Sequence, residues 1–266
     1  MTARGITTFH IGAEIGLPIP EIGGRIYNAP HNYLPHFTMP LITLVNASRS
    51  YNMTQGTVHA IDRVYLTIEA GDYLALTGPS GSGKSTLLNI LAMLDTATGG
   101  EHRWRDTPIS GASEAQRHQA RIGQIGYIFQ RCHLIERYTV AENIALALSG
   151  AVLLAAERQQ RITALLARFG LEDHASHRPS QLSLGQQQCV AICRAVIADP
   201  PLVLADEPTA HLDAHQTAQT MRLLSTLHRA GTTVVLASQD AIVAAHAPRT
   251  LQLDAGRIIA DARHRD

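Results

Sequence analysis

A glycine-rich segment at residues 78–86 has the residue types needed to hold a chain of phosphates. Glycines let the backbone curl so that several N–H groups point at phosphate oxygens, and a following helix adds its positive dipole. Lys84 would place its charge on the terminal phosphates, and the Ser85 hydroxyl could ligate Mg²⁺. The segment satisfies the P-loop pattern and lies between a predicted strand, Tyr73–Thr77, and a predicted helix, Ser85–Met93. Its sequence is Gly78-Pro79-Ser80-Gly81-Ser82-Gly83-Lys84-Ser85-Thr86.

A second candidate for phosphate chemistry is Leu202–Glu207, in which four apolar residues precede two carboxylates. The apolar run predicts a buried strand that delivers both acids at its carboxyl end. Asp206 is placed to hold Mg²⁺ through water, and Glu207 to orient or deprotonate an attacking water. By itself an apolar strand ending in acids is common, and a helix N-cap would also explain it. The P-loop earlier in the chain favours a Walker B strand.

The order of the remaining motifs resembles the nucleotide-binding domain of ABC transporters over residues 40–261. Four short stretches carry this resemblance: Ile128-Phe129-Gln130, Leu182-Ser183-Leu184-Gly185-Gln186-Gln187-Gln188, Ala210-His211-Leu212-Asp213 and Ser238-Gln239-Asp240. Two more, Val58–Ile61 and Leu204–Thr209, are similar to the branch that serves lipoprotein-release, macrolide-export and related permeases. The resemblance implies an ATPase that uses ATP and Mg²⁺.

The resemblance also implies roles for single residues within one chain. Tyr51 would stack on adenine, although it could also be an ordinary half-exposed tyrosine at a strand end. Gln130 would contact Mg²⁺ and the attacking water and relay the nucleotide state to the helical region. Gln239 would occupy the switch position at the terminal phosphate.

Other implied roles act between two chains. Ser183, Gly185 and Gln186 would cap the terminal phosphate held by the P-loop of a second domain in a head-to-tail dimer. Asp213 would meet that partner domain. Small and polar residues at 183–186 would also simply cap a helix.

Three positions depart from the family pattern. Leu184 replaces the first of two glycines in the signature, and leucine would add strain if that position needs a positive φ. Gln239 replaces the switch histidine; it can donate a hydrogen bond but cannot carry charge, and losing one such donor costs ~10²–10³ in rate. Cys189 replaces an arginine of the branch.

No pairing that includes this chain gives a standard composite site, because each site takes its signature from one domain and its switch residue from the other. We therefore expect ATP binding close to normal and slower turnover, with Glu207, Gln239 and Gln130 as catalytic residues. The alternative is a non-hydrolysing switch that closes on ATP and stays closed.

The distribution of apolar runs and turn residues predicts an α/β fold. We expect a P-loop NTPase core with a mostly parallel sheet, an antiparallel β subdomain and an inserted helical subdomain at about residues 131–183. Predicted strands are Leu41–Ala47, Tyr65–Ile68, Ile125–Phe129, Leu202–Ala205 and Thr233–Ala237, and predicted helices include Glu157–Phe169, ended by Gly170, and a buried helix over Ile144–Ala156.

The first 39 residues differ from the rest, with four prolines, few charges and no sustained periodicity. We expect 1–39 to be a flexible extension, or residues 1–38 to lie upstream of a natural start at Met39; a docking segment is the functional alternative. Residues 40–266 would form the ATP-binding domain.

Charge and hydrophobicity limit the partners. The 22 Lys and Arg residues balance 22 Asp and Glu residues, so we expect no nucleic acid partner. No apolar run reaches the roughly 18–20 residues needed to cross a bilayer. We expect a cytoplasmic homodimer or heterodimer of ATP-binding domains, attached to the inner face of the membrane through a permease on another chain. Cys189 and Cys193 are expected to pack in the core, with a metal pair as the alternative.

Overall fold

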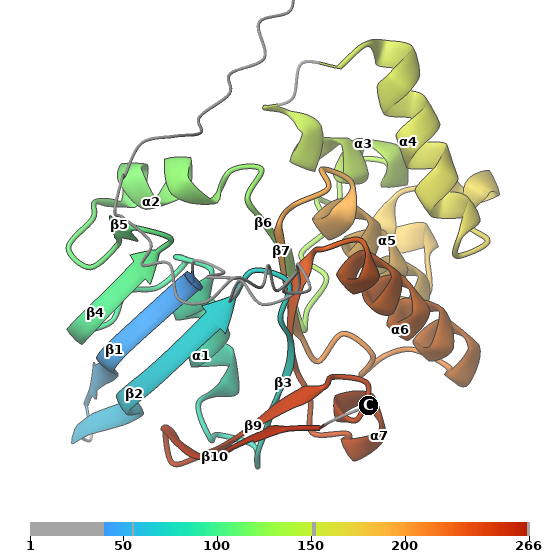
Figure 1. The fold of residues 1–266 in the computed structure, drawn as a ribbon. Helices are drawn as coiled ribbons and strands as arrows, with labels where there is room; N and C mark the ends of the chain where they lie inside the picture. The colour runs from blue at the N-terminus through green and yellow to red at the C-terminus, as the bar shows by residue number, and fades with distance from the viewer. Residues whose placement is uncertain (1–39, 55, 151–152, 265–266) are drawn as a thin grey trace, which may run out of the picture. The chain divides into compact units, whose positions relative to one another are not determined.

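The computed structural model describes residues 40–54, 56–150 and 153–264, and the expectations for residues 1–39 lie outside these ranges. The described residues form two sheets with helices packed around them (Figure 1). The strands are β1 Pro40–Met53, β2 Gly56–Glu69, β3 Tyr73–Thr77, β4 Gly99–Trp104, β5 Thr107–Pro108, β6 Ile125–Ile128, β7 Leu202–Asp206, β8 Thr233–Ala237, β9 Arg249–Asp254 and β10 Arg257–Arg263. The helices are α1 Lys84–Leu91, α2 Glu114–Arg121, α3 Val140–Ala145, η1 Leu146–Leu148, α4 Ala155–Ala167, η2 Glu172–His174, η3 Pro179–Gln181, α5 Leu184–Val196, α6 Ala214–Arg229 and α7 Ala241–Ala244.

The larger sheet has six strands in the order β10-β9-β3-β8-β7-β6. All neighbours in it are parallel except β9 and β10, which confirms the expected mostly parallel sheet. Every residue of β7 and β8 is buried, as expected for strands covered on both faces. Along β7 the side chains alternate between two core clusters: Val203 faces the cluster built with α5, and Leu204 faces the one built with α1.

The smaller sheet is antiparallel, in the order β2-β1-β4-β5. Sequence reasoning placed its first two strands at Leu41–Ala47 and Tyr65–Ile68, but each is 14 residues long. The apolar pattern fades where β1 and β2 leave the core, while their backbone pairing continues with register shifts to Met53 and Gly56. The predicted lengths were therefore wrong, because the two strands stay paired beyond the residues that are buried.

Residues 131–183 contain α3, η1, α4, η2 and η3, packed mainly against α5. The predicted continuous helix over Ile144–Ala156 is wrong: α3 ends at Ala145, η1 follows, and α4 begins only at Ala155. Ser149 and Gly150 form a turn directly after η1, and the helical run ends there. Among the described residues, no helix combines the length and hydrophobicity needed to cross a membrane.

Candidate functional site

The P-loop connects β3 to α1, and two of its glycines are enforced by contacts. Gly78 has φ +139°, and a Cβ there would lie 2.1 Å from the carbonyl oxygen of Leu253. Gly83, the N-cap of α1, has φ +103°, and a Cβ would lie 2.4 Å from the carbonyl oxygen of Ala60. Side chains at either position would collide with main-chain atoms, so the curl of the loop requires glycine.

Lys84 and Ser82 give this loop the character of an anion site. The Lys84 ammonium is 6% exposed and donates to the carbonyl oxygens of Gly78 and Pro79, at 2.8 and 2.9 Å. The buried Ser82 hydroxyl has no hydrogen-bond partner among the described residues. Two features therefore fit the binding of a phosphate chain: a buried ammonium group that bonds only carbonyl oxygens, and a buried hydroxyl that has no partner among the described residues.

Asp206 ends β7 beside this loop. Burial raises the pKa of its carboxyl group, against the hydrogen bond from Ser85 and the charge of Lys84. These two neighbours therefore compensate the buried carboxylate only in part. A carboxylate and a hydroxyl oxygen together, with negative charge still uncompensated, fit the ligand preference of Mg²⁺.

Glu207 follows at once, and its carboxylate is held by the end of β8. Its φ of +45° lies in the left-handed region, which is uncommon for a non-glycine residue. One carboxylate oxygen accepts the main-chain N–H of Gln239 at 2.9 Å, and the other accepts the Ser238 hydroxyl at 3.3 Å. The side chain of Gln239 is not part of this contact, so any residue at 239 except proline, which has no N–H, could orient Glu207 in the same way.

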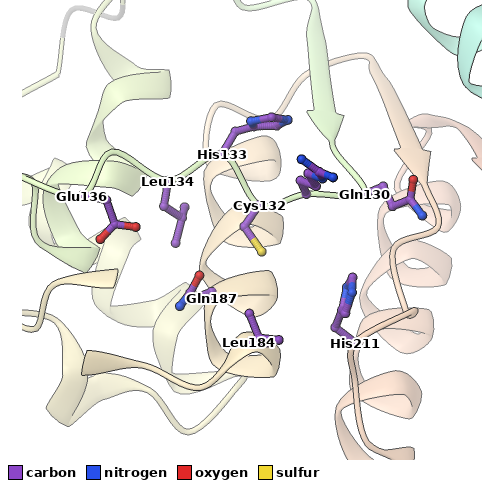
Figure 2. Close-up of a pocket in the computed structure, with 9 residues that line it drawn as sticks. Gln130, Cys132, His133, Leu134, Glu136, Leu184, Gln187 and His211 are labelled. Atoms are coloured by element: carbon purple, nitrogen blue, oxygen red, sulfur yellow. The ribbon is translucent and has the colours of Figure 1, made fainter. Parts of the chain in front are cut away.

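The residues near Gln130 line a pocket of about 330 Å³ between the segment that follows β6 and the start of α5 (Figure 2). In Figure 2, His211 points up from the loop before α6, and Leu184 stands opposite it at the first turn of α5. The lining residues are Gln130, Arg131, Cys132, His133, Leu134, Glu136, Leu184, Gln187 and His211.

Two residues of α5 that sequence reasoning missed hold this pocket together. The fully buried Gln188 amide donates to the carbonyl oxygens of Phe129 and Pro208, both at 3.4 Å. Arg194 donates to the carbonyl oxygens of Cys132 and His133, both at 2.7 Å. Gln188 therefore ties the segments after β6 and β7 to one helix. Its position in a run of three glutamines was the only signal in the sequence.

The signature residues form the first turn of α5. Ser183 is the N-cap: its hydroxyl accepts the Gln186 N–H at 3.2 Å, and the Gln186 side chain accepts the Ser183 N–H at 2.9 Å. This box leaves the N–H groups of Leu184 and Gly185 without an intrahelical partner. Leu184 is 64% exposed and is not among the residues with positive φ, so the strain considered from the sequence does not arise.

The start of α6 packs directly against this turn. Asp213 caps α6 by accepting the Gln216 N–H at 2.7 Å, and the Gln216 side chain reaches back to the Asp213 N–H. A Cβ on Gly185 would lie 2.6 Å from Oε1 of Gln216 and 3.2 Å from the carbonyl oxygen of His211. The signature turn and the 211–213 segment therefore form one unit.

The remaining predicted residues lie apart from these contacts. Tyr51 is half-buried near the end of β1, and its hydroxyl donates to Asp95 at 2.7 Å. Cys189 and Cys193 lie on α5 and are fully buried in the core, as expected of packing residues. Burial raises the pKa of the Cys189 thiol to about 12, so it stays protonated at neutral pH.

These elements form two groups. The P-loop, Asp206, Glu207 and Gln239 gather at the carboxyl ends of β3, β7 and β8, which are neighbours in the sheet. The signature and Asp213 gather at the starts of α5 and α6. A match to the family described as ABC transporter covers residues 61–210, more than half of the chain. The chain belongs to the ABC transporter family.

Curated relatives of this ABC ATP-binding chain are similar over most of its length. It is 39% identical over 223 residues to the ABC transporter ATP-binding protein YvrO of Bacillus subtilis, which covers 84% of this chain and 97% of YvrO. It is 40% identical over 225 residues to the macrolide export ATP-binding/permease protein MacB of Hyphomonas neptunium, covering 85% of this chain and 35% of MacB. It thus spans about a third of the length of that exporter.

Solved structures agree on the fold. The ATP-binding cassette MJ0796, in a dimeric post-hydrolysis state bound to ADP and Pi, superposes with a TM-score of 0.81 at 36% identity, covering 85% of this chain and 99% of MJ0796. The predicted α/β P-loop fold with an ABC ATPase arrangement is therefore confirmed.

Proposed function

We propose that this chain binds ATP with Mg²⁺, pairs head to tail with a second ATP-binding domain, and hydrolyses ATP to drive a permease on a separate polypeptide. The observation that carries the proposal is the convergence of Lys84, Asp206 and Glu207 at the carboxyl ends of β3 and β7, the two strands that flank β8 in the sheet. The printed names of relatives such as MacB, an export ATP-binding/permease protein, support the coupling to transport.

In this proposal the P-loop and the Walker B strand divide the binding of ATP. Lys84 would leave its two carbonyl partners and pair with the terminal phosphates, where its charge is worth more. The Ser85 hydroxyl and Asp206, with Gln130, would hold Mg²⁺. Bound there, Mg²⁺ would neutralise charge on the phosphate oxygens.

Glu207 would accept the proton of the attacking water, since its carboxylate is already aimed by Gln239 N–H and Ser238. The Gln239 side chain would donate to the terminal phosphate but could not carry charge. We therefore propose turnover that is slower than in the histidine-bearing pattern. The contacts of Glu207 with the main chain favour slowed over abolished hydrolysis.

The second domain would meet the signature turn and Asp213. The free N–H groups of Leu184 and Gly185 at the start of α5 suit a phosphate held by a partner's P-loop. The exposed Leu184 side chain would reduce the space through which the partner's phosphate reaches these N–H groups. Both a homodimer and a heterodimer are compatible with this arrangement, and in either one both composite sites would be altered.

The proposed location follows from the proposed partner. The chain would be cytoplasmic and attached to the inner face of the membrane through the permease, with no nucleic acid partner. The segment 131–138, in which Cys132 contacts Gln188 and the carbonyl oxygens of Cys132 and His133 accept from Arg194, would pass the motion of the nucleotide site to the permease.

The decisive experiment compares the ATPase rate and ATP affinity of wild type with those of Lys84→Ala and Glu207→Gln. We expect Lys84→Ala to lose ATP binding, and Glu207→Gln to bind ATP but lose turnover. The Leu184→Gly, Gln239→His double variant serves as the positive control and should turn over faster than wild type, by up to ~10²–10³.

The second candidate function is a non-hydrolysing switch, which Leu184 and Gln239 favour. Equal phosphate release from wild type and Glu207→Gln, with tight ATP binding, would establish the switch and refute the enzyme. Equal rates for wild type and the double variant would refute slowed turnover while leaving the ATPase in place.

A further inference from the structure

Three side chains at the end of β1 form a closed set of contacts. The Tyr51 hydroxyl donates to Oδ2 of Asp95 at 2.7 Å. The Arg49 guanidinium grips the same carboxylate at two points, with Nε 3.0 Å from Oδ2 and one Nη 2.7 Å from Oδ1. Its Cζ also lies 4.6 Å from the centroid of the Tyr51 ring. Arg49 and Asp95 side chains are each 21% exposed, so water screens the set only in part.

We infer that Arg49 and Asp95 are positioning residues that fix the Tyr51 ring as a stacking platform for the base of the nucleotide, a role that rests on the proposed function. The base needs a π-face at a defined distance from the phosphate site. The guanidinium covers one face of the ring through a cation–π contact, which leaves the other face for a base.

Asp95 also fixes the platform relative to the P-loop. It lies four residues beyond α1, the helix that begins with Lys84, and its N–H donates to the carbonyl oxygen of Asn89 in that helix at 3.1 Å. The same carboxylate accepts the Thr96 N–H at 2.7 Å, which holds the turn after α1 in shape. Asp95 therefore connects the strand that carries Tyr51, through its carboxylate, with the helix that carries the phosphate-binding lysine, through its main-chain N–H.

Preorganisation of the ring should appear as nucleotide affinity. A stacked base gains from any aromatic face, so this platform selects for the presence and size of a base and not for its hydrogen-bonding edge. Without Asp95 the phenol loses its partner, Arg49 loses its counter-charge, and the ring must be ordered when nucleotide binds. Ordering one such side chain weakens binding by about two- to tenfold.

The test measures dissociation constants for ATP and for inorganic tripolyphosphate by titration calorimetry on the full chain. Tripolyphosphate has the phosphates but no base, so it reports on the P-loop alone. We expect Tyr51→Ala to weaken ATP binding at least fivefold and Asp95→Ala by about two- to tenfold, with tripolyphosphate affinity unchanged in both. Arg49→Lys, which keeps the charge but loses the two-point grip, should lie between wild type and Asp95→Ala.

Two further variants guard against a merely structural effect. Asp199→Ala removes an exposed carboxylate that, like Asp95, is paired with an arginine, Arg161 at 3.0 Å, and should leave both affinities unchanged. Tyr51→Phe removes only the bond from the hydroxyl to Asp95 and keeps the ring. It should weaken ATP binding less than Tyr51→Ala, and it serves if Asp95→Ala does not fold.

The outcomes separate this inference from the proposed function. If Asp95→Ala and Tyr51→Phe weaken ATP and tripolyphosphate equally, or change neither, the positioning role is refuted. If Tyr51→Ala itself leaves ATP affinity unchanged, there is no platform and the inference falls, while ATP binding by the P-loop stands. If wild type binds no ATP, or Lys84→Ala binds it equally well, the proposed function itself fails.

Discussion

A methyl group on Gly185 is the smallest change that tests whether the signature turn and the start of α6 act as one unit. Gly185 does not have a positive φ, so Gly185→Ala meets no backbone barrier and acts through contacts alone. The new Cβ would lie 2.6 Å from Oε1 of Gln216 and 3.2 Å from the carbonyl oxygen of His211. Ordinary contact begins near 3.4 Å, so Oε1 must retreat by about 0.8 Å (3.4 minus 2.6).

The cost to stability should be modest. Oε1 is the flexible end of Gln216, and its retreat breaks the hydrogen bond that it accepts from the Asp213 N–H at 3.4 Å. Losing this part of the cap, together with a shift of a few tenths of an ångström at His211, should cost about 1 kcal/mol. For a unit of this size that corresponds to a fall in Tm of roughly 2–4 °C.

The cost to activity should be larger than the cost to stability. The 211–213 segment and the N–H groups of the signature turn would shift together, and misplacement of about 1 Å at a reacting centre can cost ~10² in rate. We expect Gly185→Ala to lower ATPase turnover at least tenfold and to leave the affinity of the isolated chain for ATP unchanged, because the P-loop makes no contact with Gly185.

The matched control is Gly99→Ala. Gly99 also has no positive φ, and a Cβ there meets nothing within 4 Å, so Tm and turnover should stay at wild-type values. Turnover in Gly185→Ala that follows Tm alone, or that equals the Gly99→Ala value, would refute the coupling between the two segments.

Two other positions give sharp expectations. Burial lowers the pKa of His102 from 6.5 to about 4, so the unfolded chain binds more protons between these values and stability is lost as pH falls through that window. We expect the free energy of unfolding, measured by urea titration, to be about 2 kcal/mol lower at pH 5 than at pH 7.5. His102→Leu should remove this difference. If the difference between the two pH values were the same in the variant, it would argue against a buried neutral histidine. Gly78→Ala combines φ +139° with a collision at the Leu253 carbonyl oxygen, so we expect a loss of about 2–5 kcal/mol and at least tenfold weaker ATP binding by calorimetry, whereas wild-type binding would show that the loop relaxes freely.

The parts of the fold that the sequence predicted are those in which burial and backbone pattern coincide. β3, β7 and β8 have apolar centres because they are covered on both faces, and their predicted bounds agree with the structure within one residue. By contrast α2 has no buried residue, so it leaves no apolar stripe; its capping box at Ser113 and Gln116 was the only local signal. The β9–β10 hairpin was missed for the related reason that β10 is mostly exposed.

The candidate site divides in a similar way. Residues of the P-loop and of the Walker B strand could be placed from the sequence because, within each motif, neighbours in the sequence are also neighbours in the structure. Gln188, Arg194 and Asp95 could not, since their partners lie 20 to 62 residues away and depend on how helices pack against the sheet. These three polar side chains can support the segment around Gln130 and the Tyr51 ring only after tertiary contacts form.

Two of the three departures from the family pattern, Leu184 and Gln239, change side chains at positions where the main chain does the orienting. At residue 239 the backbone N–H, not the side chain, holds the Glu207 carboxylate, and glutamine keeps that N–H. At residue 184 the backbone is helical, so leucine adds no strain and keeps the first-turn N–H that a phosphate would use. What changes is the charge available at 239 and the space above 184. In the proposed function both losses would slow hydrolysis and hinder closure with a partner, and neither touches the contacts of Lys84. Slower turnover with near-normal ATP binding is therefore the combination that we propose.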